Sequence, residues 1–230
     1  MPISIKIIKI ATFRQQGLII NQPTQLVDEN EMGFFEGDGV LEFKPQGEIF
    51  QVGSRIIEPY FANYDYRMDK SGMVFEKNFR YYFVNEKFHV YKTNDDLLLL
   101  ATRKKVADSF IKELKSEKTQ GKSVFQFKDL KIDFDQIISK AENVTGLWSQ
   151  VDRTNLNSQA FFGDHVTEDA EVKLVLQEKK TSFIQFDLSI DNKIFKLGIT
   201  KGGSIISYTT SFTSQEVLEL SLIVYDFLLK

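Results

Sequence analysis

The sequence contains no cysteine and very little histidine, proline or tryptophan. Among its 230 residues are 0 Cys, 2 His, 4 Pro and 1 Trp. Without cysteine the chain can form neither a disulfide nor a thiolate metal site. With His89 and His165 as its two histidines, it cannot build a three-histidine metal centre. We expect no cofactor.

Long hydrophobic runs are also missing. The first residues, 1–7, are interrupted by Lys6, so they lack the continuous apolar stretch of a signal peptide. No apolar run reaches the roughly 18 residues that a membrane span needs. These features, together with the absence of cysteine, predict a cytoplasmic protein that does not bind membranes.

Neither sign of charge dominates the chain. Its formal net charge is −3 and its pI is about 5.6. This balance argues against a protein that coats nucleic acid non-specifically. A chain rich in lysine, isoleucine, phenylalanine and asparagine but poor in arginine is typical of an AT-rich genome. We therefore expect a bacterial or mobile-element source, such as a phage or defence system.

Aromatic residues are abundant, and their pattern predicts strands. The chain has 21 Phe and 8 Tyr, and each buried aromatic removes about 150–250 Å² from water. Apolar residues alternate through 184–190 and 195–199 on either side of Asp191-Asn192, which predicts an antiparallel meander. Residues 79–84 and 88–91 flank Asn85-Glu86-Lys87, which predicts a hairpin. The run 97–100 predicts a strand buried on both faces.

Two main helices are expected. Residues 103–117 have apolar residues at helical spacing, with Thr102 as the expected N-cap. Thr213 and Glu216 form a capping box that begins a C-terminal helix, which is apolar on most sides and must therefore be largely buried. We predict a β-rich α+β fold with antiparallel sheets and meanders and these two helices packed on them.

The domain organisation is predicted in two lobes. Residues 1–120 would form an N-terminal β-rich lobe that ends in a basic amphipathic helix. Residues 121–230 would form an antiparallel meander with the buried C-terminal helix, although the whole chain could be one continuous domain. Both halves end in strands followed by a helix, at 73–117 and 171–230, so a duplication stays open.

The segment 161–169 is the most unusual local stretch. It places His165 among acids, after two phenylalanines and a glycine. Asp164, His165 and Glu168 could bind a divalent ion, or His165 could act as a general base, so Asp164 and His165 are weak candidate site residues. The alternative is an acidic surface loop that the Phe161-Phe162 pair anchors to the core. Glu171 and Lys173 form a Glu-x-Lys pattern, which a metal-dependent nuclease would need on a strand. Acid-x-Lys pairs are so frequent here that this match is weak.

The helix expected at 103–117 is basic. An exposed cationic face could contact phosphates, but most such faces are simply solvated. The weak candidates for nucleic-acid contact are Arg103, Lys104, Lys105, Lys112 and Lys115.

By elimination, the sequence favours a non-catalytic interaction protein. Such a protein would be a regulatory or accessory subunit that binds a protein partner or a second copy of itself. The first alternative is a nucleic-acid-binding protein that uses the 103–122 region. The second is a nuclease-like enzyme built around Asp164, Glu171 and Lys173.

Overall fold

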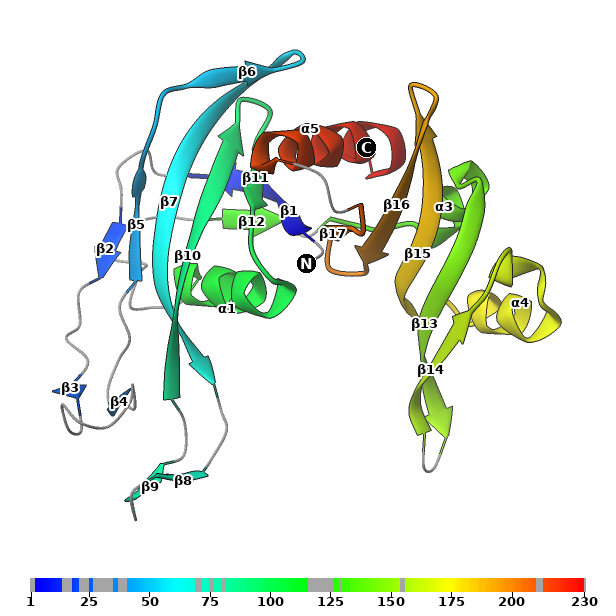
Figure 1. Ribbon diagram of the computed structural model, residues 1–230, viewed down its shortest axis with the longest axis horizontal. Helices are drawn as coiled ribbons and strands as arrows, with labels where there is room; N and C mark the ends of the chain where they lie inside the picture. The colour runs from blue at the N-terminus through cyan, green and yellow to red at the C-terminus, as the bar shows by residue number, and fades with distance from the viewer. Residues whose placement is uncertain are drawn as a thin grey trace. The chain divides into compact units, whose positions relative to one another are not determined.

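The computed structural model describes most of the chain (Figure 1). No helix in the described part is long and apolar enough to cross a membrane. The described residues are 3–13, 18–20, 25–26, 35–36, 41–68, 72–74, 77–79, 82–115, 126–128, 130–153, 156–209 and 213–229.

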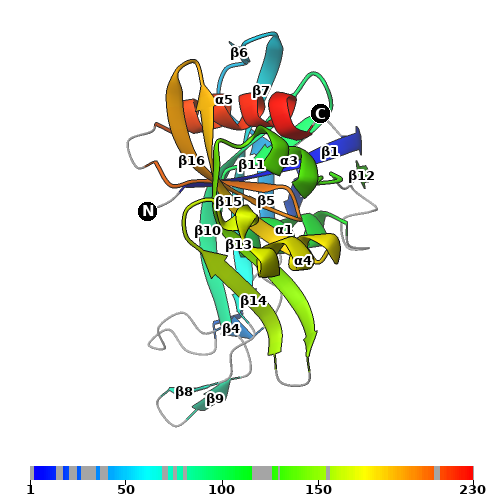
Figure 2. The ribbon, with the colours of Figure 1, turned by 90° about the vertical axis from the view of Figure 1, so that its right-hand side faces the viewer.

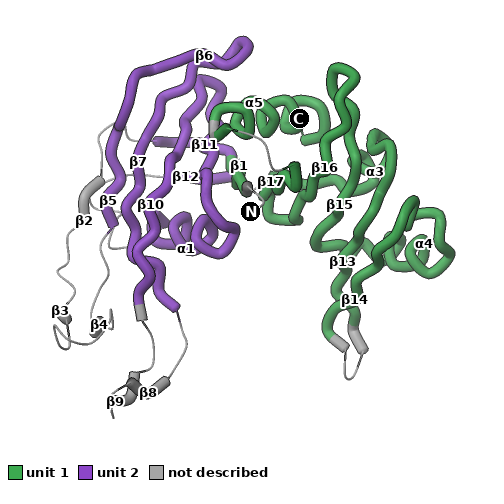
Figure 3. Tube along the Cα trace, in the orientation of Figure 1, with its two compact units in different colours: residues 1–8, 129–230 green, residues 9–128 purple. Residues whose placement is uncertain are grey.

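The chain forms two compact units (Figure 3). Unit 1 comprises residues 1–8 and 129–230, and unit 2 comprises residues 9–128. Strand β1 (Ile3–Thr12) begins in unit 1 and ends in unit 2. The division into two lobes at residue 120, which the sequence suggests, stays a prediction.

Unit 2 is built on two long antiparallel strands. Strand β7 (Arg55–Met68) pairs with β10 (Tyr82–Thr93), and β11 (Leu97–Leu100) pairs with β10 on its other side. All four leucines of β11 are buried, as predicted. The apolar side of helix α1 (Lys104–Leu114) is buried in this unit, and the Phe110 ring meets Phe43, Tyr64 and Phe88 edge-on.

Shorter strands complete unit 2. Strand β5 (Leu41–Pro45) pairs with β7, β6 (Phe50–Val52) pairs with the start of β7, and β2 (Leu18–Ile20) pairs with β5. Strand β12 (Gln126–Lys128) pairs with the end of β1. Two small ribbons join β3 (Gln25–Leu26) to β4 (Phe35–Glu36) and β8 (Gly72–Val74) to β9 (Lys77–Phe79).

The hairpin predicted at residues 85–87 was wrong. Strand β10 runs without a turn through these positions. The Asn85 amide donates to Asn63 Oδ1 at 2.7 Å and to Asp65 Oδ1 at 2.9 Å, both on β7. These cross-strand bonds satisfy an asparagine that would otherwise favour a turn.

Unit 1 contains the predicted meander. Strand β15 (Thr181–Ile190) turns at Asp191 and Asn192 into β16 (Lys193–Thr200), which pairs with β17 (Ser204–Ser207). Both turn residues have positive φ, as a tight two-residue hairpin requires. On the outer side, β15 pairs with β13 (Asn143–Arg153) and β13 pairs with β14 (Leu156–Phe162), so that β14 ends the strand order. The first residues of β1 pair with β17.

Helices cover one side of the β13–β15 region. Helix α3 (Phe134–Lys140) begins at Asp133, and helix α4 (Ala170–Gln177) follows a short 3-10 turn at Val166–Glu168. Both helices lie to the right of these strands in Figure 1 and in front of them in Figure 2. Leu147 of β13 packs against Val172 and Val175 of α4, which identifies the helix side of the sheet.

The C-terminal helix has the predicted start. Helix α5 (Ser214–Val224) is capped by Thr213 in a complete capping box with Glu216, and a π-helical turn follows at Tyr225–Leu229. Most of its apolar residues are buried, and Ile223 and Phe227 are the large apolar side chains of this helix that are exposed.

The predicted β-rich α+β class, with antiparallel sheets, is confirmed. Four α-helices lie in the described residues. The predicted cap at Thr102 was wrong, because α1 begins after Arg103 and has no side-chain cap. The apolar residues of 124–132 also predict a strand, of which residues 126–128 form β12. Proline and glycine residues among acids predict a loop at 21–39, most of which lies outside the described residues.

Candidate functional site

Four aromatic side chains form a row on the side of the unit 1 sheet that faces away from α4. The Trp148 ring meets Phe162 at 4.5 Å and Phe183 at 4.9 Å between centroids. Tyr208 follows β17, and its ring would lie 3.3 Å from a Cβ atom placed on Gly198. We call Trp148, Phe162, Phe183 and Tyr208 the aromatic face.

Strand register places these rings together. Phe162 of β14 lies opposite Gly146 of β13, and Phe183 of β15 lies opposite Trp148. Directly opposed residues of antiparallel strands share one side of the sheet. The neighbouring residue Leu147 points to the helix side, where it packs on α4. Trp148 and its partners therefore project from the other side.

Two glycines lie beneath the rings. A Cβ atom on Gly146 would come within 3.0 Å of the Trp148 ring, and one on Gly198 would come within 2.5 Å of the Phe183 ring. The same Cβ on Gly198 would lie 3.3 Å from the Tyr208 ring. The rings of Trp148, Phe183 and Tyr208 therefore pack directly against the backbone at these glycines, where a residue with a Cβ atom would crowd them.

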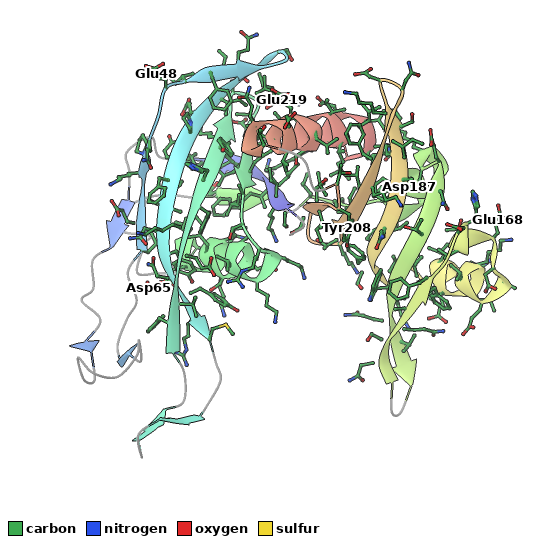
Figure 4. All side chains as sticks on the ribbon, in the orientation of Figure 1. Glu48, Asp65, Glu168, Asp187, Tyr208 and Glu219 are labelled. Atoms are coloured by element: carbon green, nitrogen blue, oxygen red, sulfur yellow. The ribbon has the colours of Figure 1, made fainter. Side chains whose placement is uncertain are left out.

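The aromatic face is partly open to solvent. Phe162 is 67% exposed, whereas Trp148, Phe183 and Tyr208 are half-buried. Burial raises the pKa of the Tyr208 phenol. Asp187 and Lys196 lie directly opposite each other in register on the same side; Asp187 and Tyr208 are labelled in Figure 4.

The rings are perpendicular to one another. The interplanar angle is 89° between Trp148 and Phe162 and 79° between Trp148 and Phe183. Edge-to-face contacts of this kind are the favoured packing of aromatic side chains. They do not give a set of parallel platforms on which successive bases could stack.

The structure places Asp164 and His165 in the exposed turn after β14. The His165 backbone has a left-handed conformation, with φ of 50°. Its amide donates to Asn143 Oδ1 at 2.8 Å, and the Asn143 amide reaches Asp164 Oδ1 at 3.5 Å. Asn143 therefore holds the conformation of this turn through the His165 backbone.

Glu171 and Lys173 do not lie on a strand, contrary to what the nuclease hypothesis required. Both are exposed residues of α4. Asp169 caps this helix by accepting from the Glu171 amide at 2.8 Å, and Glu171 Oε1 accepts from the Gln159 side chain of β14 at 2.7 Å. Glu171 thus ties α4 to β14.

The Phe161-Phe162 pair divides between the two sides of the sheet. Phe161 packs on the cluster of Leu147, Val172 and Val175, so it does anchor this region to the core. Phe162 points the other way and belongs to the aromatic face. The expectation that both rings anchor this segment to the core was right for Phe161 and wrong for Phe162. Both residues belong to a strand, where successive side chains point to opposite sides of the sheet.

The basic helix is α1, whose solvent side carries both signs of charge. Arg103 forms an ion pair with Glu86 of β10. Lys104, Lys105 and Lys112 are exposed, with exposed Asp108 between them along the helix. The exposed residue Lys115 has its ammonium 5.4 Å from the centre of the Phe127 ring of β12.

In the described part of the chain no group of His, Asp and Glu side chains is arranged to hold a metal ion. No protein-family model matches the chain, and comparisons with curated proteins and with solved structures find no match either. The sequence reasoning missed the aromatic face. Two signals for it were the single tryptophan, two positions after Gly146, and Phe183, which falls on the polar side of an alternating strand.

Proposed function

We propose that this protein is a non-catalytic interaction protein that binds another protein through the aromatic face of unit 1. The observation that carries the proposal is the contact of the exposed Phe162 with the half-buried Trp148 and Phe183. Tryptophan, tyrosine and phenylalanine are enriched at protein interfaces, and tryptophan and tyrosine dominate their binding energy. A regulatory or accessory role in a bacterial or mobile-element system fits this activity.

The partner surface should be apolar and nearly uncharged. Around the rings, Asp187 and Lys196 oppose each other in register, so these two charges offset one another. A phosphate backbone would need an excess of cations. The perpendicular rings also favour an irregular apolar protein surface over stacked bases.

Site-directed photo-crosslinking in the native host tests this proposal. A photoreactive amino acid at position 162 is compared with the same group at Ile49, a matched exposed apolar residue of unit 2. A protein captured at position 162 is then purified, and its affinity is measured by calorimetry for the parent chain, Phe162→Ala and Ile49→Ala.

The proposal predicts a loss of affinity of about tenfold or more for Phe162→Ala, the size typical of an interface hot spot. Ile49→Ala should bind like the parent. If every captured protein binds Phe162→Ala and the parent equally, the aromatic face is not a protein-binding surface.

Nucleic-acid binding by α1 is a second candidate. The observation that favours it is Lys115, whose ammonium lies 5.4 Å from the centre of the half-buried Phe127 ring. Cations next to an aromatic ring can hold a single strand. Fluorescence anisotropy with labelled oligonucleotides should then show affinity that falls steeply with salt and weakens in a Lys112→Ala, Lys115→Ala double variant. Binding that is absent at low salt would remove this candidate.

A further inference from the structure

We propose that β14 pairs in antiparallel fashion with β14 of a second copy of the chain, so that the unit 1 sheets of two copies become continuous. The inference goes beyond the proposed function, because it concerns the backbone edge of the sheet, with which the aromatic face shares only Phe162. It rests on the backbone of β14, on the chemistry of its residues and on the apolar side chains that flank it.

The outer edge of β14 is the end of the strand order in unit 1. In an antiparallel pair, residues alternate between bonding to the partner strand and pointing their backbone groups away from it. The Gly163 amide donates to the Thr145 carbonyl at 3.2 Å, which fixes the phase of this alternation. The backbone N–H and C=O groups of Ser158, Ala160 and Phe162 therefore point away from β13, toward the outer edge of β14.

The residues of β14 from Ser158 to Phe162 lack the usual barriers to pairing, because the register shift between β13 and β14 falls before them, between Leu156 and Ser158. The strand reads LNSQAFF and contains no charged residue and no proline. Edge strands of proteins that stay monomeric usually carry lysine, proline or a bulge to block a second strand. The absence of charge also means that two antiparallel copies bring no like charges together, which would otherwise be destabilising.

Exposed apolar side chains flank this edge on both sides of the sheet. Phe162 projects on the aromatic side and is 67% exposed. On the helix side, Glu171 bonds Gln159 of β14, and Leu174 lies three residues further along the same side of α4. Leu174 is 62% exposed. A strand added to β14 would cover both side chains.

A second copy of the chain suits this edge better than an unrelated strand. Two identical strands related by a two-fold axis each offer what the other needs: free amides and carbonyls, an uncharged sequence and an apolar residue on each side. Interfaces of this self-complementary kind are the commonest in homo-oligomers.

Sedimentation equilibrium of the purified full chain tests the inference through its mass over a concentration series. The decisive variant is Ala160→Pro, which removes an outward amide without removing a bond to β13. Its matched control is Ala160→Val, which keeps the amide and suits a strand. Ser158→Lys is an independent variant that adds a charge to the edge but no backbone change, and circular dichroism confirms that each variant is folded.

We expect the parent chain and Ala160→Val to reach the mass of a dimer as concentration rises, and Ala160→Pro and Ser158→Lys to stay folded monomers. If Ala160→Pro fails to fold, Ser158→Lys decides. A parent chain that is monomeric at every concentration overturns the inference. So does a dimer that survives in the folded edge variants. The edge variants keep all four rings, so the affinity of a folded edge variant for a protein captured at position 162 tests the proposed function separately.

Discussion

The Phe183 ring depends on the absence of a single carbon atom beneath it. Gly198 has no Cβ, and that position would lie 2.5 Å and 2.7 Å from two atoms of the ring. No strain in the glycine backbone is involved, so the contact alone requires glycine here.

Gly198→Ala should therefore destabilise the protein by about 1–3 kcal/mol, as expected for overpacking. Phe183→Leu in the same chain should recover part of this loss, because the smaller side chain leaves room for the added methyl group. Urea denaturation measures both effects. The matched control is Gly202→Ala, where the new Cβ would lie 3.5 Å from the end of the flexible Lys6 side chain. Equal losses at the two glycines would contradict this account.

Asp95 should make the stability of unit 2 sensitive to acid. It accepts from Arg55 Nε at 2.8 Å and from Thr93 Oγ1 at 2.5 Å. Burial acts to raise the pKa of Asp95, but the hydrogen bonds from Arg55 and Thr93 and the positive charge of Arg55 outweigh it and lower the pKa. The stabilisation is thus present above the unfolded-state pKa of Asp95 and is lost as pH falls through the lower folded-state pKa.

Asp95→Asn should cost about 1–3 kcal/mol at neutral pH, because the buried Arg55 loses its charged acceptor. The difference between this variant and the parent should shrink on acidification through the folded-state pKa of Asp95. Thermal melts from neutral to acid pH measure it. Asp96→Asn, a neighbouring carboxylate with a positive φ that asparagine tolerates, is the control; an equal loss there would point to a general charge effect.

Among the elements, α5 has the most clearly defined beginning. Its N-cap Thr213 accepts from the Glu216 amide at 3.3 Å, and Glu216 Oε2 accepts from the Thr213 amide at 2.7 Å. The hydrogen bonds that the Thr213 amide and hydroxyl donate to the Glu216 carboxylate lower the pKa of Glu216.

Thr213→Ala should destabilise the protein by about 1 kcal/mol through loss of this cap. Thr213→Ser keeps the hydroxyl group and should stay close to the parent in denaturant melts. An unchanged midpoint in the alanine variant would mean that the cap contributes nothing to stability.

Elements defined by local pattern were predictable from the sequence. The meander in unit 1 follows from strict alternation around Asp191-Asn192, and the start of α5 follows from the spacing of Thr213 and Glu216. Helix α4 was missed, although Asp169 is a good N-cap and Val172 and Val175 have helical spacing, because the segment is short and follows an acidic stretch.

Elements defined by distant partners were not predictable in the same way. Asn85-Glu86-Lys87 has the composition of a turn, and the bonds that keep it in β10 come from Asn63 and Asp65, some 20 residues earlier. The aromatic face draws its rings from β13, β14, β15 and the end of β17, so it exists only once the register of these strands is set. The sequence shows a single tryptophan, but it does not show which aromatic residues of other strands lie beside it.

At the scale of the whole molecule, the side chains of α5 and of the π-helical turn that follows it contribute to stability according to how far they are buried. Leu228 is 1% exposed in a single chain, whereas Ile223 is 43% exposed. The burial of Leu228 therefore requires no second copy.

Leu228→Ala should cost about 2–5 kcal/mol, as for other large-to-small changes in a core. Ile223→Ala should cost much less. Denaturant melts give the stabilities, and light scattering gives the mass. If Leu228→Ala instead yields a folded monomer of parental stability from a parental dimer, the helix is an oligomer interface rather than a core element.

The pairing of β1 also determines the order in which the two units can fold during translation. Ile5 of β1 pairs with Ile205 of β17, so Ile5 is synthesised long before its partner. Residues 9–128, by contrast, contain all the segments of unit 2 and can complete it much earlier. Until synthesis passes residue 207, the isoleucines at the start of β1 have no strand β17 to pair with, and we expect chaperones to have access to them during that time.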